Sequence, residues 1–217
     1  MSIMSKIFDI LPNLLRGLNY TLIVFGLTLL FSFPLSLFVA WGRVSKNKLI
    51  QKTLATYISI MRGTPLLLQI IFVYYGLPLI GIIFDRLTAV IIAFTLNYAA
   101  YFAEILRGGI QSIDPGQYEA CQVTGISTFY TYRYIIIPQV LSRTFTAISN
   151  EIITLVKDTS LIYVVGIGEL LHVAKIQANL HVTLIPYLLA GIIYFIIILI
   201  LTKILTKIER RFVLYER

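Results

Sequence analysis

The sequence predicts an all-α membrane protein with five transmembrane helices, and three observations support that fold class. Hydrophobic residues make up 58% of the 217 residues, and the mean hydropathy is +0.87. Charged residues make up only 13%, about half the share found in ordinary soluble domains. Apolar runs of about 20 residues, the length that crosses a bilayer as a helix, recur between basic segments. The chain is therefore expected to be a multi-pass membrane protein.

Five segments are long and apolar enough to be spans. They are Gly17–Gly42, Lys52–Asp85, Leu87 to about Gly109, Thr144–Gly168 and Leu184–Leu201. The first follows a short amphipathic N-terminal stretch, which we expect to lie at the membrane interface. In the second, Pro65 removes a backbone donor and predicts a bend. At the end of the fourth, Gly166 and Gly168 predict irregular backbone, which is tolerated at membrane depth only where it lines a cavity or is buried in protein.

Basic residues are concentrated in alternate connections, and this distribution predicts the orientation. They are Arg43, Lys46, Lys48 and Lys52 after the first span, Arg107, Arg133 and Arg143 between the third and fourth, and Lys203, Lys207, Arg210, Arg211 and Arg217 after the fifth. Because cytoplasmic loops collect Lys and Arg, the N-terminus is expected outside and the C-terminus in the cytoplasm. The same rule accounts for the net charge of +8, so no nucleic-acid partner is expected.

The chain is expected to form one transmembrane domain over residues 1–217, because its loops are too short to fold alone. It contains no G-x-x-x-x-G-K-[ST] phosphate loop, so it is not expected to bind ATP by that route. The single cysteine, Cys121, excludes an internal disulfide, and the spacing of His172 and His181 suits no common metal motif. We expect no cofactor bound by this chain.

A segment from about 112 to 140 is too polar and too interrupted to be a span. Asp114-Pro115 predicts the start of a short helix over residues 116–124, and Gly125 predicts its end. Four aromatic rings follow, at Phe129, Tyr130, Tyr132 and Tyr134. Such rings suit docking onto a partner protein, and equally suit a helix at the depth of the lipid headgroups.

The same segment resembles the EAA loop of ABC importer permeases. The family pattern is E-A-A, three residues, G, nine residues and I-x-L-P; here it is Glu119-Ala120-Cys121, Gly125 and Ile135-x-Ile137-Pro138, with departures only at Cys121 and Ile137. Three further stretches resemble the polar amino acid subfamily: RGTPLLLQIIFVYYGLP (62–78), NYAAYFAEILRGGIQSIDPGQYEA (97–120) and LVKDTSLIYVVGIGELL (155–171).

This resemblance implies the type I importer permease fold, in the inner membrane of a bacterium. It also implies that Glu119, Ala120, Gly125, Ile135 and Pro138 belong to coupling helices that dock into a cleft of an ATPase subunit. The implied partners are two ATPase subunits that hold the ATP, a second permease subunit of the same or a sibling chain, and an extracytoplasmic solute-binding protein. The implied solute is a polar amino acid.

Polar residues inside spans are costly, at about 2.5 to 3.5 kcal/mol for a charge at the helix centre, and they usually mark a functional site. Asn97, Tyr101 and Glu104 share one face of the third span, and Glu151, Thr154 and Asp158 share one face of the fourth. With Thr64 and Ser160, they form the candidate solute-binding set. Other readings stay open: Glu104 with Arg107 and Asp158 with Lys157 could be structural ion pairs, and the Pro65 region a simple kink.

The three carboxylates suit a cationic amino acid such as arginine, lysine or histidine. Glutamine, cystine, an opine or methionine are alternative solutes. A membrane-embedded enzyme is less favoured, because it would need a nucleophile–base pair or a metal set within the spans, and neither histidine lies in one. A purely structural subunit is disfavoured, because scaffolding does not need carboxylates inside the membrane.

Overall fold

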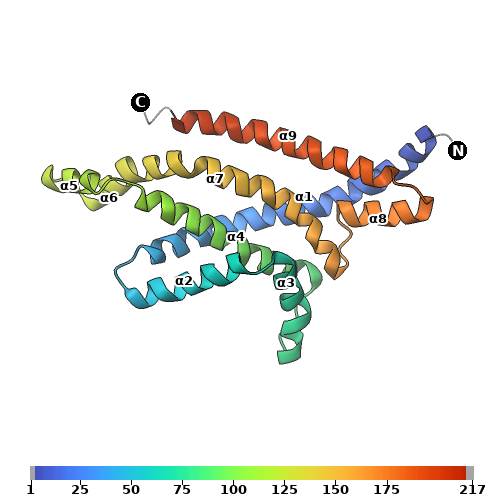
Figure 1. Cartoon of the computed structure of the whole chain (residues 1–217), viewed down its shortest axis with the longest axis horizontal. Coiled ribbons are helices and arrows are strands. Elements are labelled where there is room, and N and C mark those ends of the chain that lie inside the picture. Colours follow the sequence, from blue (N-terminus) through green and yellow to red (C-terminus); the bar gives the residue numbers. More distant parts are fainter. Residues whose placement is uncertain (1–2, 214–217) are drawn as a thin grey trace.

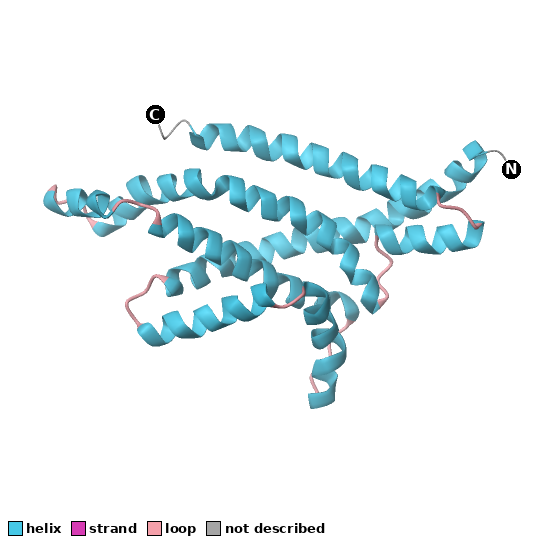
Figure 2. Cartoon of the chain, in the orientation of Figure 1, coloured by secondary structure: helices cyan, strands magenta, loops and turns pink. Residues whose placement is uncertain are grey.

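The computed structural model describes residues 3–213, with side chains for residues 7–211; residues 1–2 and 214–217 of the expected domain lie outside the described part. Every regular element in that range is helical (Figure 2). In chain order they are α1 (Ile3–Arg43), α2 (Lys48–Gly63), α3 (Leu66–Ile71), the π-helix η1 (Phe72–Gly76), the 3₁₀ helix η2 (Leu77–Ile80), α4 (Arg86–Gln111), α5 (Pro115–Val123), α6 (Thr128–Tyr130), the π-helix η3 (Thr131–Ile136), α7 (Ile137–Asp158), the 3₁₀ helix η4 (Thr159–Val165), α8 (Leu170–His181) and α9 (Ile185–Val213).

Among the described residues, three helices are long and apolar enough to cross a membrane: α1, α4 and α9. Two further candidates are bent pairs. Helix α2 meets α3–η2 at 105°, and the continuous run from Thr128 to Val165 meets α8 at 58°. If each pair is one span, up to five spans result. The predicted all-helical, multi-pass architecture is therefore confirmed, and its long helices lie lengthwise beside one another (Figure 1).

Helix α4 is the centre of the bundle. Its most apolar stretch is 61% buried, against 28% for α1 and 11% for α9. Small side chains let neighbouring backbones approach it closely; those that are buried include Ala89, Ala93, Ala99, Ala100 and Ala103. Phe94, Tyr98 and Phe102 fill the space between these small residues and are almost completely buried. The third predicted span is therefore the element against which α1, α2, α3 and α7 pack, whereas α9 packs on α7 and α8.

The N-terminal stretch differs from the sequence prediction. Instead of a separate interfacial segment, it forms the first turns of α1, which runs without a break to Arg43. Ile10 and Leu14 are completely buried there and pack on residues of α8 and α9, namely Leu170, Ala174 and Ala190. This tertiary packing, which a sequence pattern does not reveal, makes the stretch part of the bundle.

The bend predicted at Pro65 is present and sharp. Thr64 and Pro65 are extended, with ψ of 145° and 133°, and α3 starts in a new direction after them (Figure 1). The break leaves backbone carbonyls of α2 without helical partners, and side chains satisfy them instead. The Asn97 Nδ2 and Gln69 Nε2 groups donate to the Met61 carbonyl at 2.9 and 3.0 Å, and Gln69 Nε2 also donates to the Thr64 carbonyl at 3.2 Å.

The irregular backbone predicted at the end of the fourth span is also present. The chain leaves α7 as the 3₁₀ helix η4 and reaches Gly166, whose φ is +73°. The next helix, α8, was not predicted. It begins at the completely buried Glu169, whose carboxylate accepts hydrogen bonds from the Leu171 and His172 N–H groups, both at 2.6 Å, and from the Tyr194 hydroxyl at 3.2 Å.

The segments expected in the cytoplasm gather at one end of the bundle. The α1–α2 connection, helices α5 and α6 and the C-terminal end of α9 all lie at the left of Figure 1, while α1 begins at the opposite end. The N-terminal end of α1 and the C-terminal end of α9 therefore lie at opposite ends of the bundle, as the distribution of basic residues predicts. Which end faces the cytoplasm stays a prediction.

Close packing of α4 against α7 depends on Gly109. A Cβ atom there would lie 2.2 Å from Thr144 Cγ2 and 3.1 Å from Val140 Cγ1, whereas at Gly108 it would meet nothing within 4 Å. We expect Gly109→Ala to cost about 1 to 3 kcal/mol by overpacking and to lower the Tm of the purified protein in detergent by several degrees. The matched variant Gly108→Ala should leave the Tm unchanged or raise it, because Ala favours helix. Equal Tm values for the two variants would contradict this packing account.

Candidate solute pocket and coupling segment

A cavity of about 520 Å³ opens where the α2–α3 bend faces α4 and α7. Its volume falls in the usual range for small-molecule sites, about 300 to 1,000 Å³. The lining residues come from four elements: Arg62, Gly63, Thr64, Pro65 and Leu66 from the bend, Asn97, Tyr98 and Tyr101 from α4, Glu151, Thr154 and Asp158 from α7, and Leu161 from η4. Six predicted residues, Thr64, Asn97, Tyr101, Glu151, Thr154 and Asp158, therefore meet at one cavity. Glu104 and Ser160 do not line it.

Asp158 lines this cavity and is held in place by a residue of α4. Its Oδ2 atom accepts a hydrogen bond of 2.7 Å from the hydroxyl of Tyr98 on α4. No ion pair between Asp158 and Lys157 occurs among the described residues. Tyr98 is a lining residue that sequence reasoning missed, because its spacing differs by one residue from the polar face of Asn97. The hydrogen bond holds the Asp158 carboxylate at the cavity wall and leaves acceptor capacity on it.

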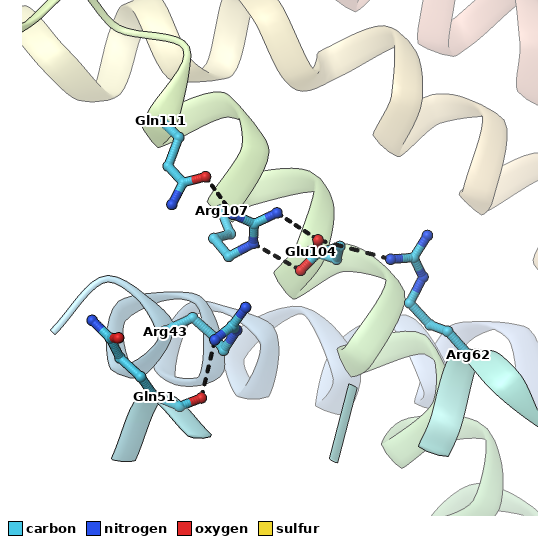
Figure 3. Close-up of polar contacts among 6 residues, drawn as sticks. All are labelled: Arg43, Gln51, Arg62, Glu104, Arg107 and Gln111. Atoms are coloured by element: carbon cyan, nitrogen blue, oxygen red, sulfur yellow. Dashed lines mark hydrogen bonds and ion pairs between the residues drawn. The ribbon is translucent and has the colours of Figure 1, made fainter. Parts of the chain in front are cut away.

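Glu104 belongs to a charged cluster next to the cavity. Arg107 donates to both oxygens of its carboxylate, Nη2 to Oε1 at 2.6 Å and Nε to Oε2 at 2.9 Å. The Arg62 Nη1 atom lies 4.0 Å from the same Oε1, so Glu104 sits between two arginines (Figure 3). The structural pairing of Glu104 with Arg107, which the sequence left open, is therefore what the structure contains.

Arg62 is the cation of the cavity and was not among the predicted solute-binding residues. The available signal was that it is the one charged residue between Lys52 and Asp85 in the second predicted span. Its guanidinium carbon lies 5.3 Å from the centre of the Tyr101 ring. Both side chains line the cavity, so the charged cluster and the cavity share this edge.

The side-chain amide of Asn97 is used mainly in hydrogen bonds within the protein. Asn97 is 4% exposed, and its Nδ2 group donates to the Met61 carbonyl at 2.9 Å and to Gln69 Oε1 at 3.1 Å. Both N–H groups are therefore used inside the protein, which leaves the Oδ1 acceptor for a solute. The Thr64 hydroxyl likewise donates to the Ile60 carbonyl at 2.8 Å and accepts from Gln69 Nε2 at 2.8 Å. Ser160 donates to the Lys157 carbonyl at 2.7 Å, outside the cavity.

The ionised side chains of the cavity are unbalanced. Arg62 supplies one positive charge, and Glu151 and Asp158 supply two negative charges, so the lining carries a net charge of −1 when both carboxylates are ionised. Unpaired charge away from water is unfavourable. A small polar solute with a positive charge would reduce that cost, whereas an anion would increase it.

The segment expected to couple to a partner lies at the far end of α4 and α7. Asp114 Oδ1 accepts from the Gly116 N–H at 2.7 Å and starts α5, and Gly125, with φ of +71°, ends it. The helix and turn predicted there are confirmed. A small apolar cluster of Ile113, Ile136 and Val140 fixes the segment to the bundle.

The outer side of this segment is exposed and aromatic. Glu119, Ala120 and Gly125 are exposed, and Ile135 and Pro138 are partly buried. The four predicted rings, Phe129, Tyr130, Tyr132 and Tyr134, are all exposed. Beside them lies a shallow apolar hollow of about 680 Å³ lined by Gly125, Ile126, Ser127, Tyr130, Tyr134 and Ile135.

Known proteins share both the sequence and this architecture. Residues 32–214 match the family described as "Binding-protein-dependent transport system inner membrane component". The chain is 36% identical to the arginine transport system permease protein ArtQ of Bacillus subtilis, covering 93% of each chain. It is 37% identical to the L-cystine transport system permease protein TcyB of the same organism, over 92% of this chain and 86% of that protein.

A solved structure described as an amino acid ABC transporter with histidines matches with a TM-score of 0.88 at 34% identity, covering 97% of this chain and 99% of that one. The MetNI methionine ABC transporter matches with a TM-score of 0.72 at 18% identity, which supports the fold alone. Permeases of this kind work with a binding protein and an ATPase, and they are transport components rather than enzymes. The chain therefore belongs to the inner membrane components of binding-protein-dependent transport systems, as a multi-pass permease of an amino acid ABC importer.

Proposed function

We propose that this permease carries cationic amino acids, such as arginine, lysine or histidine, through the cavity between the α2–α3 bend, α4 and α7. The observation that supports this choice is the pair of carboxylates, Glu151 and Asp158, that line one cavity with Arg62 as its one cationic side chain. An arginine or lysine solute carries a net charge of +1, so it would make the loaded cavity neutral. Glutamine would leave the net charge at −1.

The names of similar permeases agree with this proposal without deciding it. One relative is named for arginine, others for glutamine and cystine, all at 33 to 37% identity. Identity at that level is therefore compatible with more than one solute. Glutamine, cystine, an opine and methionine remain the alternatives, and the charge of the cavity is what separates a cationic solute from them.

The assembly that we propose contains two permease subunits, identical or siblings, two ATPase subunits and an extracytoplasmic binding protein. The segment 119–138 docks onto the ATPase on the cytoplasmic side, so that closure of the ATPase dimer is passed to the spans. The exposed rings and the apolar hollow beside Gly125 support this contact, because aromatic side chains are enriched in protein interfaces. The Ile113 cluster gives the segment a rigid connection to α4 and α7.

Asp158→Asn tests the solute. The substitution removes one negative charge and changes the shape of the side chain little. A charge-assisted hydrogen bond is worth about 1.5 to 3 kcal/mol, so we expect transport of arginine, and of histidine at a pH low enough to protonate its imidazole, to need about 10- to 150-fold more solute, while glutamine is affected little. The measurement is uptake into proteoliposomes at saturating binding protein.

Ser160→Ala is the matched control for this experiment. Ser160 lies two residues from Asp158 and does not line the cavity, so its loss should leave uptake of all three amino acids unchanged. Equal losses for arginine, histidine and glutamine in Asp158→Asn would indicate a structural role for this carboxylate. Unchanged uptake would show that the cavity does not select the charge of the solute.

Gly125 tests the coupling contact. Its positive φ disfavours a β-branched residue, whereas Asn tolerates this conformation. We expect Gly125→Val to insert and to bind solute normally, but to lose uptake and the response of ATP hydrolysis to the binding protein. Gly125→Asn should keep most of both activities. Full transport by Gly125→Val would refute the coupling assignment.

A further inference from the structure

Arg62 lines the cavity, and its guanidinium group has few polar partners within the protein. Its closest carboxylate oxygen, Glu104 Oε1, is 4.0 Å away, and the centre of the Tyr101 ring is 5.3 Å away. These are its one ion pair and its one cation–π contact among residues 7–211, and its charged group makes no hydrogen bond there. The side chain is 43% exposed and lines the cavity. All five N–H donors are therefore available.

The neighbouring carboxylate does not compete strongly for these donors. Arg107 binds both oxygens of Glu104 from the opposite side, as Figure 3 shows, at 2.6 and 2.9 Å. The Glu104 charge is therefore neutralised mainly by Arg107. An arginine left in this state, beside a cavity, is suited to bind a carboxylate through two parallel hydrogen bonds.

Two of the charged groups of the cavity, Arg62 and Asp158, contact α4 at different levels; the third, Glu151, lies about two turns before Asp158 on α7. Arg62 contacts Glu104 and Tyr101, whereas Asp158 is hydrogen-bonded to Tyr98. Tyr101 lies three positions and Glu104 six positions after Tyr98, so the two levels are separated by about 4.5 to 9 Å of helix rise. An amino acid with a cationic side chain has the same polarity, because its carboxylate and its side-chain charge lie at opposite ends of the molecule.

We propose that Arg62 binds the α-carboxylate of the transported amino acid and thereby determines that the cavity accepts amino acids rather than the corresponding amines. The side-chain cation then lies toward Asp158, and the solute has one orientation in the cavity. This inference rests on the proposed function and adds the group that recognises the part of the solute common to all amino acids.

The test compares L-arginine with agmatine, which has the same guanidinium end but no carboxylate. Direct binding to the purified permease–ATPase complex is measured by calorimetry in the absence of the binding protein, so that only the permease selects. Wild type should bind L-arginine about 10- to 100-fold more tightly than agmatine. In Arg62→Gln, the preference for L-arginine over agmatine should disappear: the affinity for L-arginine falls, while the affinity for agmatine is unchanged or rises, because the variant removes a positive charge from a cavity that binds a dication.

Two further variants keep the result interpretable. Arg62→Lys retains the charge without the paired donors and should show an intermediate preference. If Arg62→Gln lowers the Tm of the complex, Arg62→Lys provides the test of Arg62 instead. Asp158→Asn should weaken both ligands by the same factor, because both carry the guanidinium end.

The outcomes separate this inference from the proposed function. If Asp158→Asn weakens both ligands but Arg62→Gln and Arg62→Lys leave the preference for L-arginine intact, the role of Arg62 is refuted and the cationic-solute proposal stands. If both Arg62 variants lose affinity for the two ligands equally, Arg62 is structural and its role is likewise refuted. If wild type binds neither ligand, both proposals fail.

Discussion

The break between α2 and α3 is the constraint on which the cavity depends. In a membrane, every backbone polar group must find a partner inside the protein, and Pro65 removes a donor at the point where the chain turns by 105°. The Asn97 and Gln69 side chains donate hydrogen bonds to the Met61 carbonyl in place of the missing backbone donor. Because Asn97 is on the central helix α4, the bend is fixed against the most buried element of the bundle. The turned-away backbone then leaves the space in which Thr64, Tyr101 and Asp158 meet.

The charged residues around that space are connected through Glu104, which lies between Arg107 and the cavity residue Arg62. Beside the cavity, Arg107 and Glu104 neutralise one another through two hydrogen bonds. Within the cavity, Arg62, Glu151 and Asp158 are not paired with one another. Uncompensated charges in a transmembrane bundle are unfavourable unless a ligand or water meets them. In the function we propose, this imbalance favours a solute with a net positive charge and gives the permease a basis for selection that does not depend on the binding protein.

Sequence patterns predicted those parts of the fold that depend on local periodicity. Runs of apolar residues predicted the spans, and Pro65 predicted the bend. The three- and four-residue spacings predicted that Asn97 and Tyr101 share one helix face and that Glu151, Thr154 and Asp158 share another. All five of these residues line the cavity. Features set by contacts between distant segments were missed. The N-terminal stretch joins α1 because Ile10 and Leu14 pack on α8 and α9, and α8 forms on the buried Glu169. Tyr98 and Arg62 line the cavity because of their contacts with other helices, Tyr98 with Asp158 on α7 and Arg62 with Glu104 on α4. Spacing along one helix does not predict such contacts.

The central claim is that the solute binds in the cavity between the α2–α3 bend, α4 and α7, and chemical accessibility tests it most directly. In a Cys121→Ala background, Thr154→Cys places one thiol in the cavity wall, and Ile192→Cys places one on the exposed surface of α9. The rate of modification by a small, charged, membrane-impermeant thiol reagent is measured with and without L-arginine. The account predicts that the thiol at position 154 reacts and that L-arginine slows the reaction several-fold, whereas the thiol at position 192, exposed on a candidate membrane span, does not react. A thiol at position 154 that does not react, or that reacts equally fast with L-arginine present, would contradict it.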